Sequence, residues 1–161
     1  MMEIKEITKR DQDFLFEMLY ESIYTAPDIP RPSRDIIERP EISKYVENWG
    51  KPGDFGLIAV NDGNEKIGAV WMRYLTGPMK GYGYINDTIP EIGIAVDKEH
   101  RGKGVGTALL RELLERTGPE VQSVSLSVQA SNPAKKLYER LGFRVCSTSG
   151  NSVIMRFDRP A

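Results

Sequence analysis

Residues 91–117 read EIGIAVDKEHRGKGVGTALLRELLERT. Over Glu91–Val96, branched apolar residues alternate with Glu, Gly and Ala, and this period of two predicts a strand. Over Gly104–Thr117, valine and leucine recur at spacings of three and four residues, which predicts an amphipathic helix. The segment therefore predicts a strand and a helix joined by a short polar turn, as in the α/β fold class.

The turn itself, Arg101-Gly102-Lys103-Gly104-Val105-Gly106, has the features of an anion site. Three glycines in five residues let the backbone approach a ligand closely and adopt positive φ. The free N–H groups and the positive dipole end of the following helix point to the same place. The turn therefore predicts a phosphate site, with a purely structural tight turn as the alternative. Its spacing matches neither a Walker loop nor a dinucleotide fingerprint.

A second helix is predicted to begin after Asn132, because Asn and the following Pro133 are both favoured at helix starts. Apolar residues at i, i+3, i+4 and i+7 from Ala134 share one face of this helix. Gly142 is then expected to end it in a left-handed conformation.

The rest of the chain carries further strand and helix patterns. From Pro27 to Pro52 it holds five of its ten prolines, which predicts loops with short helical pieces such as Glu41–Asn48. No repeat or linker interrupts the chain, so residues 1–161 predict one α/β domain with a mixed, strongly twisted sheet of six or seven strands and helices on both faces. The other predicted elements are a helix over Asp11–Ile23 and strands over Glu3–Ile7, Leu57–Val60, Lys66–Leu75, Val121–Val128, Phe143–Ser147 and Ser152–Phe157.

Composition excludes several classes of protein. With 22 basic and 23 acidic residues the formal charge is −1, so no global positive field favours nucleic acid or an anionic membrane. No apolar run reaches the roughly 20 residues of a spanning helix, and the first residues lack a signal peptide's apolar stretch. One cysteine and one histidine exclude an internal disulfide and a conventional zinc site. We expect a cytoplasmic protein without a structural metal.

Two motifs together resemble a known family. The pattern Arg101-x-x-Gly104-x-Gly106 resembles the pyrophosphate loop of GNAT acetyltransferases, whose signature is Gln/Arg-x-x-Gly-x-Gly/Ala. About 30 residues downstream, Asn132–Phe143 is similar to the second cofactor segment of the same family. The resemblance is close over Glu91–Val145, and the order of predicted elements fits along the whole chain. The chain thus resembles a GNAT superfamily N-acetyltransferase.

The resemblance implies a site for acetyl-CoA and no metal. The sheet would splay between Glu91–Val96 and Val121–Val128, where one strand would pair with the pantetheine arm and the glycine loop would hold the pyrophosphate. Asn132 would hydrogen-bond the cofactor and Tyr138 would lie near its sulfur, although the step between them is six residues where many relatives have seven. The implied cofactor-binding residues are Ile94, Ala95, Val96, Arg101, Gly102, Lys103, Gly104, Val105, Gly106, Thr107, Asn132 and Tyr138.

The implied reaction is direct transfer of acetyl from CoA to a primary amine, without a covalent enzyme intermediate. The amine must lose a proton, the oxyanion needs donors near Ala95 or Val96, and the thiolate benefits from a proton. Tyr138 could supply that proton, with a core tyrosine as the alternative. Glu91 could accept the amine's proton directly or through water, or act as a counter-ion. Two alternatives remain open: Asp87 could act as the base instead, or Glu91 could be a surface carboxylate without a role in the reaction.

The acceptor is expected to be a small-molecule or peptide amine, and the protein a monomer or homodimer. The aromatic loop Gly81–Tyr84 and the proline-rich stretch Ile29–Pro32 are candidates to line the acceptor pocket. Three alternatives stay open: a non-catalytic acyl-CoA-binding sensor, an acyltransferase with a different acyl donor and, least favoured, a nucleotide-binding regulator.

Overall fold

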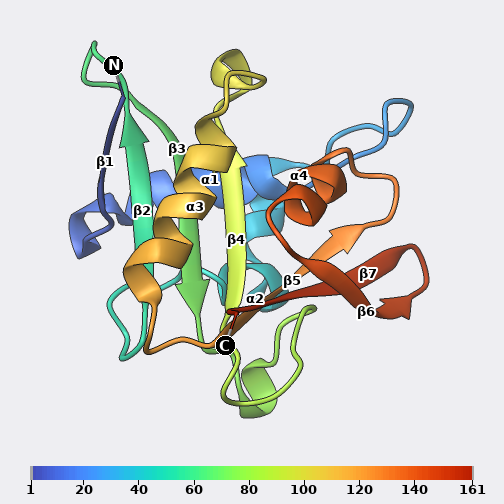
Figure 1. Cartoon of the computed structure of the whole chain (residues 1–161). Helices are drawn as coiled ribbons and strands as arrows, with labels where there is room; N and C mark the ends of the chain where they lie inside the picture. The colour runs from blue at the N-terminus through green and yellow to red at the C-terminus, as the bar shows by residue number, and fades with distance from the viewer. Residues whose placement is uncertain (1, 161) are drawn as a thin grey trace.

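The computed structural model describes residues 2–160, so the two end residues of the predicted domain lie outside it. These residues form one seven-stranded mixed sheet (Figure 1). The strands are β1 (Glu3–Glu6), β2 (Phe55–Val60), β3 (Lys66–Arg73), β4 (Glu91–Val96), β5 (Ser123–Gln129), β6 (Arg144–Ser149) and β7 (Ser152–Asp158). The helices are α1 (Gln12–Ser22), α2 (Pro40–Ser43), α3 (Val105–Thr117) and α4 (Ala134–Arg140), with 3-10 turns at Lys9–Asp11, Arg34–Glu38, Gly77–Met79 and Lys98–His100.

The strand order is β1-β2-β3-β4-β5-β7-β6, and the predicted splay lies at its centre. All neighbouring strands are antiparallel except β4 and β5, which run parallel with α3 as their crossover. These two strands share a single register pair, Glu91 with Ser125. Beyond that pair they diverge, so the sheet opens along the rest of β4.

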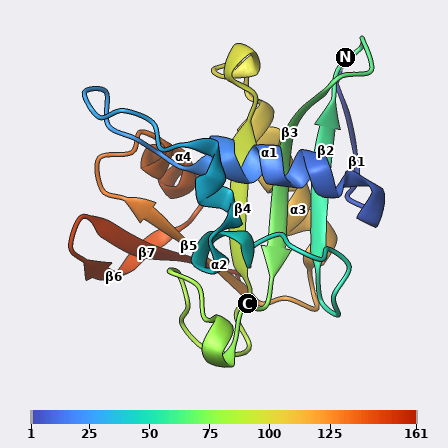
Figure 2. The same ribbon diagram turned by 180° about the vertical axis from the view of Figure 1, so that it is seen from behind.

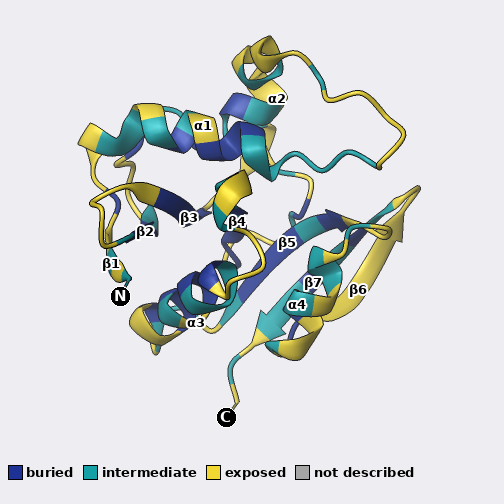
Figure 3. Ribbon diagram, turned by 90° about the horizontal axis from the view of Figure 1, so that it is seen from above, coloured by how far each residue is buried: buried dark blue, intermediate teal, exposed yellow. Residues whose placement is uncertain are grey.

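Helices cover both faces of the sheet, as predicted. Figure 3 shows α1 and α2 on one side of the sheet and α3 and α4 on the other. Figure 2, which views the molecule from behind, shows α1 crossing in front of β2, β3 and β4. The leucines of α3 pack against one face, and a second cluster around Leu15, Val46 and Trp71 packs against the other. Burial of both faces explains why β2 and β3 consist almost entirely of buried residues.

The ends of α4 follow the local signals in the sequence. The side-chain oxygen of Asn132 accepts a hydrogen bond of 2.9 Å from the Ala134 amide. Gly142 adopts φ 101°, and the amide of Phe143 donates to the carbonyl of Tyr138 at 3.0 Å. This Schellman closure directs Phe143 back against the helix and sets its ring 5.8 Å from that of Tyr138.

Most predicted boundaries differ from the structure by one or two residues, and the helical piece in the proline-rich stretch differs by more. The helical piece expected over Glu41–Asn48 is limited to Pro40–Ser43, and the chain then continues in turns to Asn48, which has φ 51°. The strand expected over Phe143–Ser147 begins at Arg144 and runs to Ser149, because Phe143 belongs to the closure of α4. This strand is one of the two outer edges of the sheet, and all its residues are exposed.

Candidate active site

The open edge of β4 is the first element of the site. The amide of Asp97 donates to Ile67 of β3 at 2.8 Å, so strand alternation turns the backbone groups of Ala95 toward β3 as well. Those of Ile94 and Val96 face away from β3, toward the splay. Among the three residues that the resemblance implied, Ile94 and Val96 therefore present backbone groups to the opening, whereas Ala95 presents only its side chain.

A cavity of about 490 Å³ lies beside this edge and is called here the loop cavity. It runs between β4, the start of α3 and the start of α4. The residues from sequence analysis that line it are Ile94, Ala95, Val96, Arg101, Gly106, Asn132 and Tyr138. The side chain of Val105 is buried in the core instead, so only its backbone is available to a ligand.

The glycine loop has the geometry of an anion site. Gly104 is the residue before α3 and adopts φ 84°, and its carbonyl accepts the first helical hydrogen bond, from Ala108, at 3.0 Å. The amides of the first helical turn, Val105 to Thr107, have no partner within the helix. A side chain at Gly104 would meet nothing within 4 Å, so the loop faces open space. The loop can therefore receive an anion.

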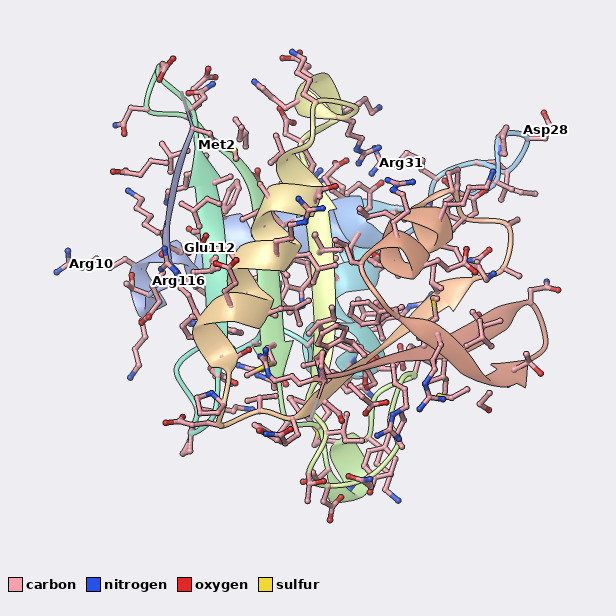
Figure 4. All side chains as sticks on the ribbon, viewed as in Figure 1. Met2, Arg10, Asp28, Arg31, Glu112 and Arg116 are labelled. Atoms are coloured by element: carbon pink, nitrogen blue, oxygen red, sulfur yellow. The ribbon has the colours of Figure 1, made fainter. Side chains whose placement is uncertain are left out.

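Two arginines and a glutamate, from three separate segments, meet at the loop cavity. Arg101 donates to the Val96 carbonyl at 2.9 Å and to Glu21 at 3.1 Å, and Arg31 contacts Glu21 at 3.3 Å. Arg31, which is labelled in Figure 4, lines the loop cavity together with Leu137 of α4. Arg31 and Glu21 were missed by sequence analysis, because Arg31 belongs to a proline-rich loop with no motif. That stretch was predicted to line an acceptor pocket, whereas Arg31 lines the loop cavity.

A second cavity, of about 420 Å³, adjoins the first and is called here the carboxylate cavity because it holds Glu91. Its walls come from α1, α2, β3, β4, β5 and β7, and they include Tyr82 from the predicted aromatic loop. Six residues line both cavities: Ser22, Ile23, Tyr24, Ile94, Asn132 and Tyr138. The site therefore has two compartments that meet at this shared wall.

Glu91 is buried, with 4% of its surface exposed. Its Oε2 atom accepts hydrogen bonds from the Tyr45 hydroxyl at 2.7 Å and the Gly83 amide at 3.0 Å. Its Oε1 atom has no hydrogen-bond partner within residues 2–160. Burial raises the pKa of Glu91, and the two hydrogen bonds and the charge of Lys44 only partly offset this effect. Such a carboxyl group takes up a proton more readily than an exposed one.

Tyr138 and Asp87 differ in their access to the site. Tyr138 is 7% exposed, its pKa is raised to about 12 by burial, and no hydrogen bond engages its hydroxyl within the described chain. The hydroxyl therefore keeps its proton at neutral pH and is free to donate it. Asp87 is exposed, accepts a 2.6 Å hydrogen bond from the Tyr84 hydroxyl and lines neither cavity.

Glu91→Gln is expected to raise the melting temperature near neutral pH. Because the pKa of Glu91 is above its ordinary 4.5 in the folded protein, the fold binds this proton more tightly than the unfolded chain does. The stability from this group is complete below that ordinary value and is lost as pH rises through the raised folded pKa. Thermal melts should give equal values near about pH 4 and a stabilised variant near about pH 7. A variant that is less stable throughout this range would contradict the expectation.

Residues 2–160 hold no group of three or more His, Cys, Asp or Glu side chains that could bind a metal ion. None of the helices in that range combines the length and apolarity needed to span a membrane.

Comparison with known proteins agrees with this geometry. The model of the acetyltransferase (GNAT) family matches residues 16–143. The chain is 30% identical over 101 residues to the L-amino acid N-acetyltransferase AaaT of Escherichia coli, a match that covers 61% of this chain and 58% of that relative.

Solved structures give the same fold over nearly the whole chain. The PaiA N-acetyltransferase of Thermoplasma acidophilum in complex with coenzyme A has a TM-score of 0.67 at 22% identity, with 99% of each chain covered. The ribosomal-protein-S18-alanine N-acetyltransferase of E. coli has a TM-score of 0.65 at 20% identity, covering 98% of this chain and 94% of the other. The shared fold agrees with the family match over residues 16–143, which shows that the chain belongs to the acetyltransferase (GNAT) family, a family of acyltransferases.

Proposed function

We propose that this protein transfers the acetyl group of acetyl-CoA directly to a primary amine. The observation that carries the proposal is the meeting of two compartments at a shared wall that includes Ile94, Asn132 and Tyr138. One compartment lies beside a glycine loop suited to a diphosphate, and the other holds a buried carboxylate suited to an amine. A donor and an acceptor entering from the two sides would meet at Tyr138.

The loop cavity is the proposed site of acetyl-CoA. The amides from Gly102 to Thr107 would bind the diphosphate, with Arg101, Lys103 and Arg31 supplying positive charge. The pantetheine amides would pair with the backbone groups of Ile94 and with the N–H of Val96, whose carbonyl already accepts from Arg101. The Asn132 side-chain oxygen is occupied by the Ala134 amide, so its NH₂ group would be the donor to the cofactor.

The carboxylate cavity is the proposed site of the amine. The amine nitrogen attacks the acetyl carbonyl carbon, and the oxyanion that forms accepts from the N–H of Ile94 or Val96. As the carbon–sulfur bond breaks, Tyr138 gives its proton to the leaving thiolate. The proton lost by the amine passes to Glu91 through a water molecule. The products are the acetylated amine and CoA.

The function is tested by coenzyme A binding followed by turnover. CoA at about 100 times its Kd should stabilise the fold by about 2.7 kcal/mol, which a thermal shift measures. A panel of primary amines with acetyl-CoA should then release free thiol. No thermal shift would overturn the cofactor site, and a shift without thiol release from any amine would favour a non-catalytic acyl-CoA sensor. Competition between acyl-CoA esters of different chain length tests the acyl donor.

The kinetics of the Glu91→Gln variant distinguish the two possible roles of Glu91, as a base and as a counter-ion. Loss of a base should lower kcat, most strongly at low pH, where free amine is scarce. Loss of a counter-ion should mainly raise KM for the amine and leave kcat nearly intact. If neither constant changes, Glu91 has neither role.

We expect the protein to act in the cytoplasm, as a monomer or homodimer, on a small-molecule or peptide amine.

A further inference from the structure

We propose that the carboxylate cavity selects amines that carry a neutral oxygen near the amino group and no carboxylate, as in an amino-acid amide or the N-terminus of a peptide. This inference rests on the proposed function, because it assigns the acceptor of the same site. Three features of the cavity support it: the charge of its lining, two unpartnered polar atoms and its apolar walls.

The charge of the cavity lining is negative. Of the described residues that line it, Glu91 alone is charged. The nearby cations lie outside this lining: Arg73 is 2% exposed and bound to Asp54 at 2.8 Å, and Lys44, whose charge partly offsets the burial of Glu91, donates to the Lys80 carbonyl at 2.6 Å. A substrate ammonium group would therefore be attracted, whereas a substrate carboxylate would meet a like charge without a counter-ion in the cavity lining.

The cations of the site lie in the other compartment. Arg31, Lys98 and Arg101 line the loop cavity and not the carboxylate cavity. This separation of charge matches an anionic donor on one side and a cationic acceptor without an acidic group on the other.

A neutral donor accompanies Glu91 on the same face of the sheet. The indole of Trp71 lies flat against Gly93, where an added Cβ atom would come within 2.5 Å of the ring, so the close packing requires glycine. Trp71 pairs with Gly93 across β3 and β4, and Gly93 is two residues from Glu91, so both side chains point to the same side.

Both side chains keep one polar atom without a partner. Trp71 is 1% exposed, and its Nε1 atom and the Oε1 atom of Glu91 are the two buried side-chain polar atoms in the described chain that lack a hydrogen bond. Leaving such atoms unpaired is costly. An amine can donate to Glu91 while a neutral oxygen accepts from Trp71, directly or through one trapped water. An amide carbonyl offers that oxygen without adding negative charge.

The remaining walls favour an apolar body on the acceptor. Leu19, Ile42, Ile92, Leu126 and Val153 line the cavity, whose volume of about 420 Å³ is that of a small-ligand site. An aliphatic side chain next to the amino group would pack against these residues.

The test compares three matched amines with the wild-type enzyme: L-leucinamide, L-leucine and 3-methylbutylamine. They share the aliphatic body and differ in whether an amide, a carboxylate or nothing stands beside the amine. With kcat/KM corrected for the fraction of free amine, leucinamide should exceed each of the others by about tenfold or more. Equal or better turnover of L-leucine, or of the plain amine, overturns the proposal. If none of the three is acetylated while other amines are, the proposal fails and the proposed function stands. No turnover of any amine defeats the proposed function itself.

Two variants assign the selectivity to its residues. Trp71→Phe should lower the ratio of kcat/KM for leucinamide over 3-methylbutylamine, because it removes the indole N–H. Glu91→Gln should lower the ratio for leucinamide over L-leucine, because it removes the repelling charge. Ratios within one variant cancel any general loss of rate, and CoA-induced thermal shifts check that each variant folds. Unchanged ratios in both variants overturn the assignment, and if Trp71→Phe does not fold, the wild-type ratios decide.

Discussion

Replacing Gly104 with aspartate is expected to weaken coenzyme A binding by more than about a hundredfold. The new carboxylate would stand at the start of α3, where it can accept hydrogen bonds from the same amides that the diphosphate needs. Because aspartate is a favoured N-cap residue and tolerates left-handed φ, the unliganded fold should remain stable. The variant should therefore melt close to the wild type without ligand and lose the CoA-induced thermal shift.

Gly77→Asp is the matched control for this change. Gly77 also adopts positive φ, 59°, and a side chain there also meets nothing within 4 Å. It begins a 3-10 turn and lines neither cavity. This control shares the backbone strain and the added charge, so it should keep the full CoA shift. A wild-type shift in Gly104→Asp would mean that the glycine loop is only a structural turn.

Tyr138→Phe is expected to lower kcat by between about tenfold and about a thousandfold while leaving CoA binding intact. The phenyl ring keeps the packing against Phe143, and the deleted hydroxyl has no hydrogen bond within residues 2–160 to lose. The melting temperature should therefore stay within about 1–2 °C of the wild type. Single-turnover thiol release measures the chemical step directly.

Removal of a tyrosine hydroxyl outside the site provides the control for Tyr138→Phe. Tyr74 is 36% exposed and lines neither cavity, so Tyr74→Phe should keep the wild-type kcat. A normal chemical rate in Tyr138→Phe would assign Tyr138 to the core alone. A fall in the melting temperature together with kcat would also remove the case for a proton donor.

Much of the fold could be predicted from the sequence because its signals are short-range. The strand Glu91–Val96 has the predicted bounds, and α3 begins one residue later than predicted. The start and end of α4 depend on Asn132 and Gly142, whose contacts lie within a few residues along the chain. Hydrophobic periodicity, helix caps and the conformation of glycine depend on about ten neighbouring residues. They can therefore be recognised without knowing the rest of the chain.

The proline-rich segment is where this reasoning failed. The helix expected over Glu41–Asn48 ends after Ser43, because turns that pack against α1 and the sheet, not local periodicity, set the path of the chain there. The bounds of α2 thus depend on contacts with distant residues.

The chemical setting of the site was decided only by the tertiary structure. The sequence pointed to Glu91 and Tyr138, but the hydrogen bonds from Tyr45 and Gly83 that hold the Glu91 carboxylate come from two separate loops. The proximity of Arg31 to Arg101 likewise appears only after folding. Burial, pKa and the pairing of charges depend on which segments close over a residue, and that information lies in contacts between residues far apart in the chain.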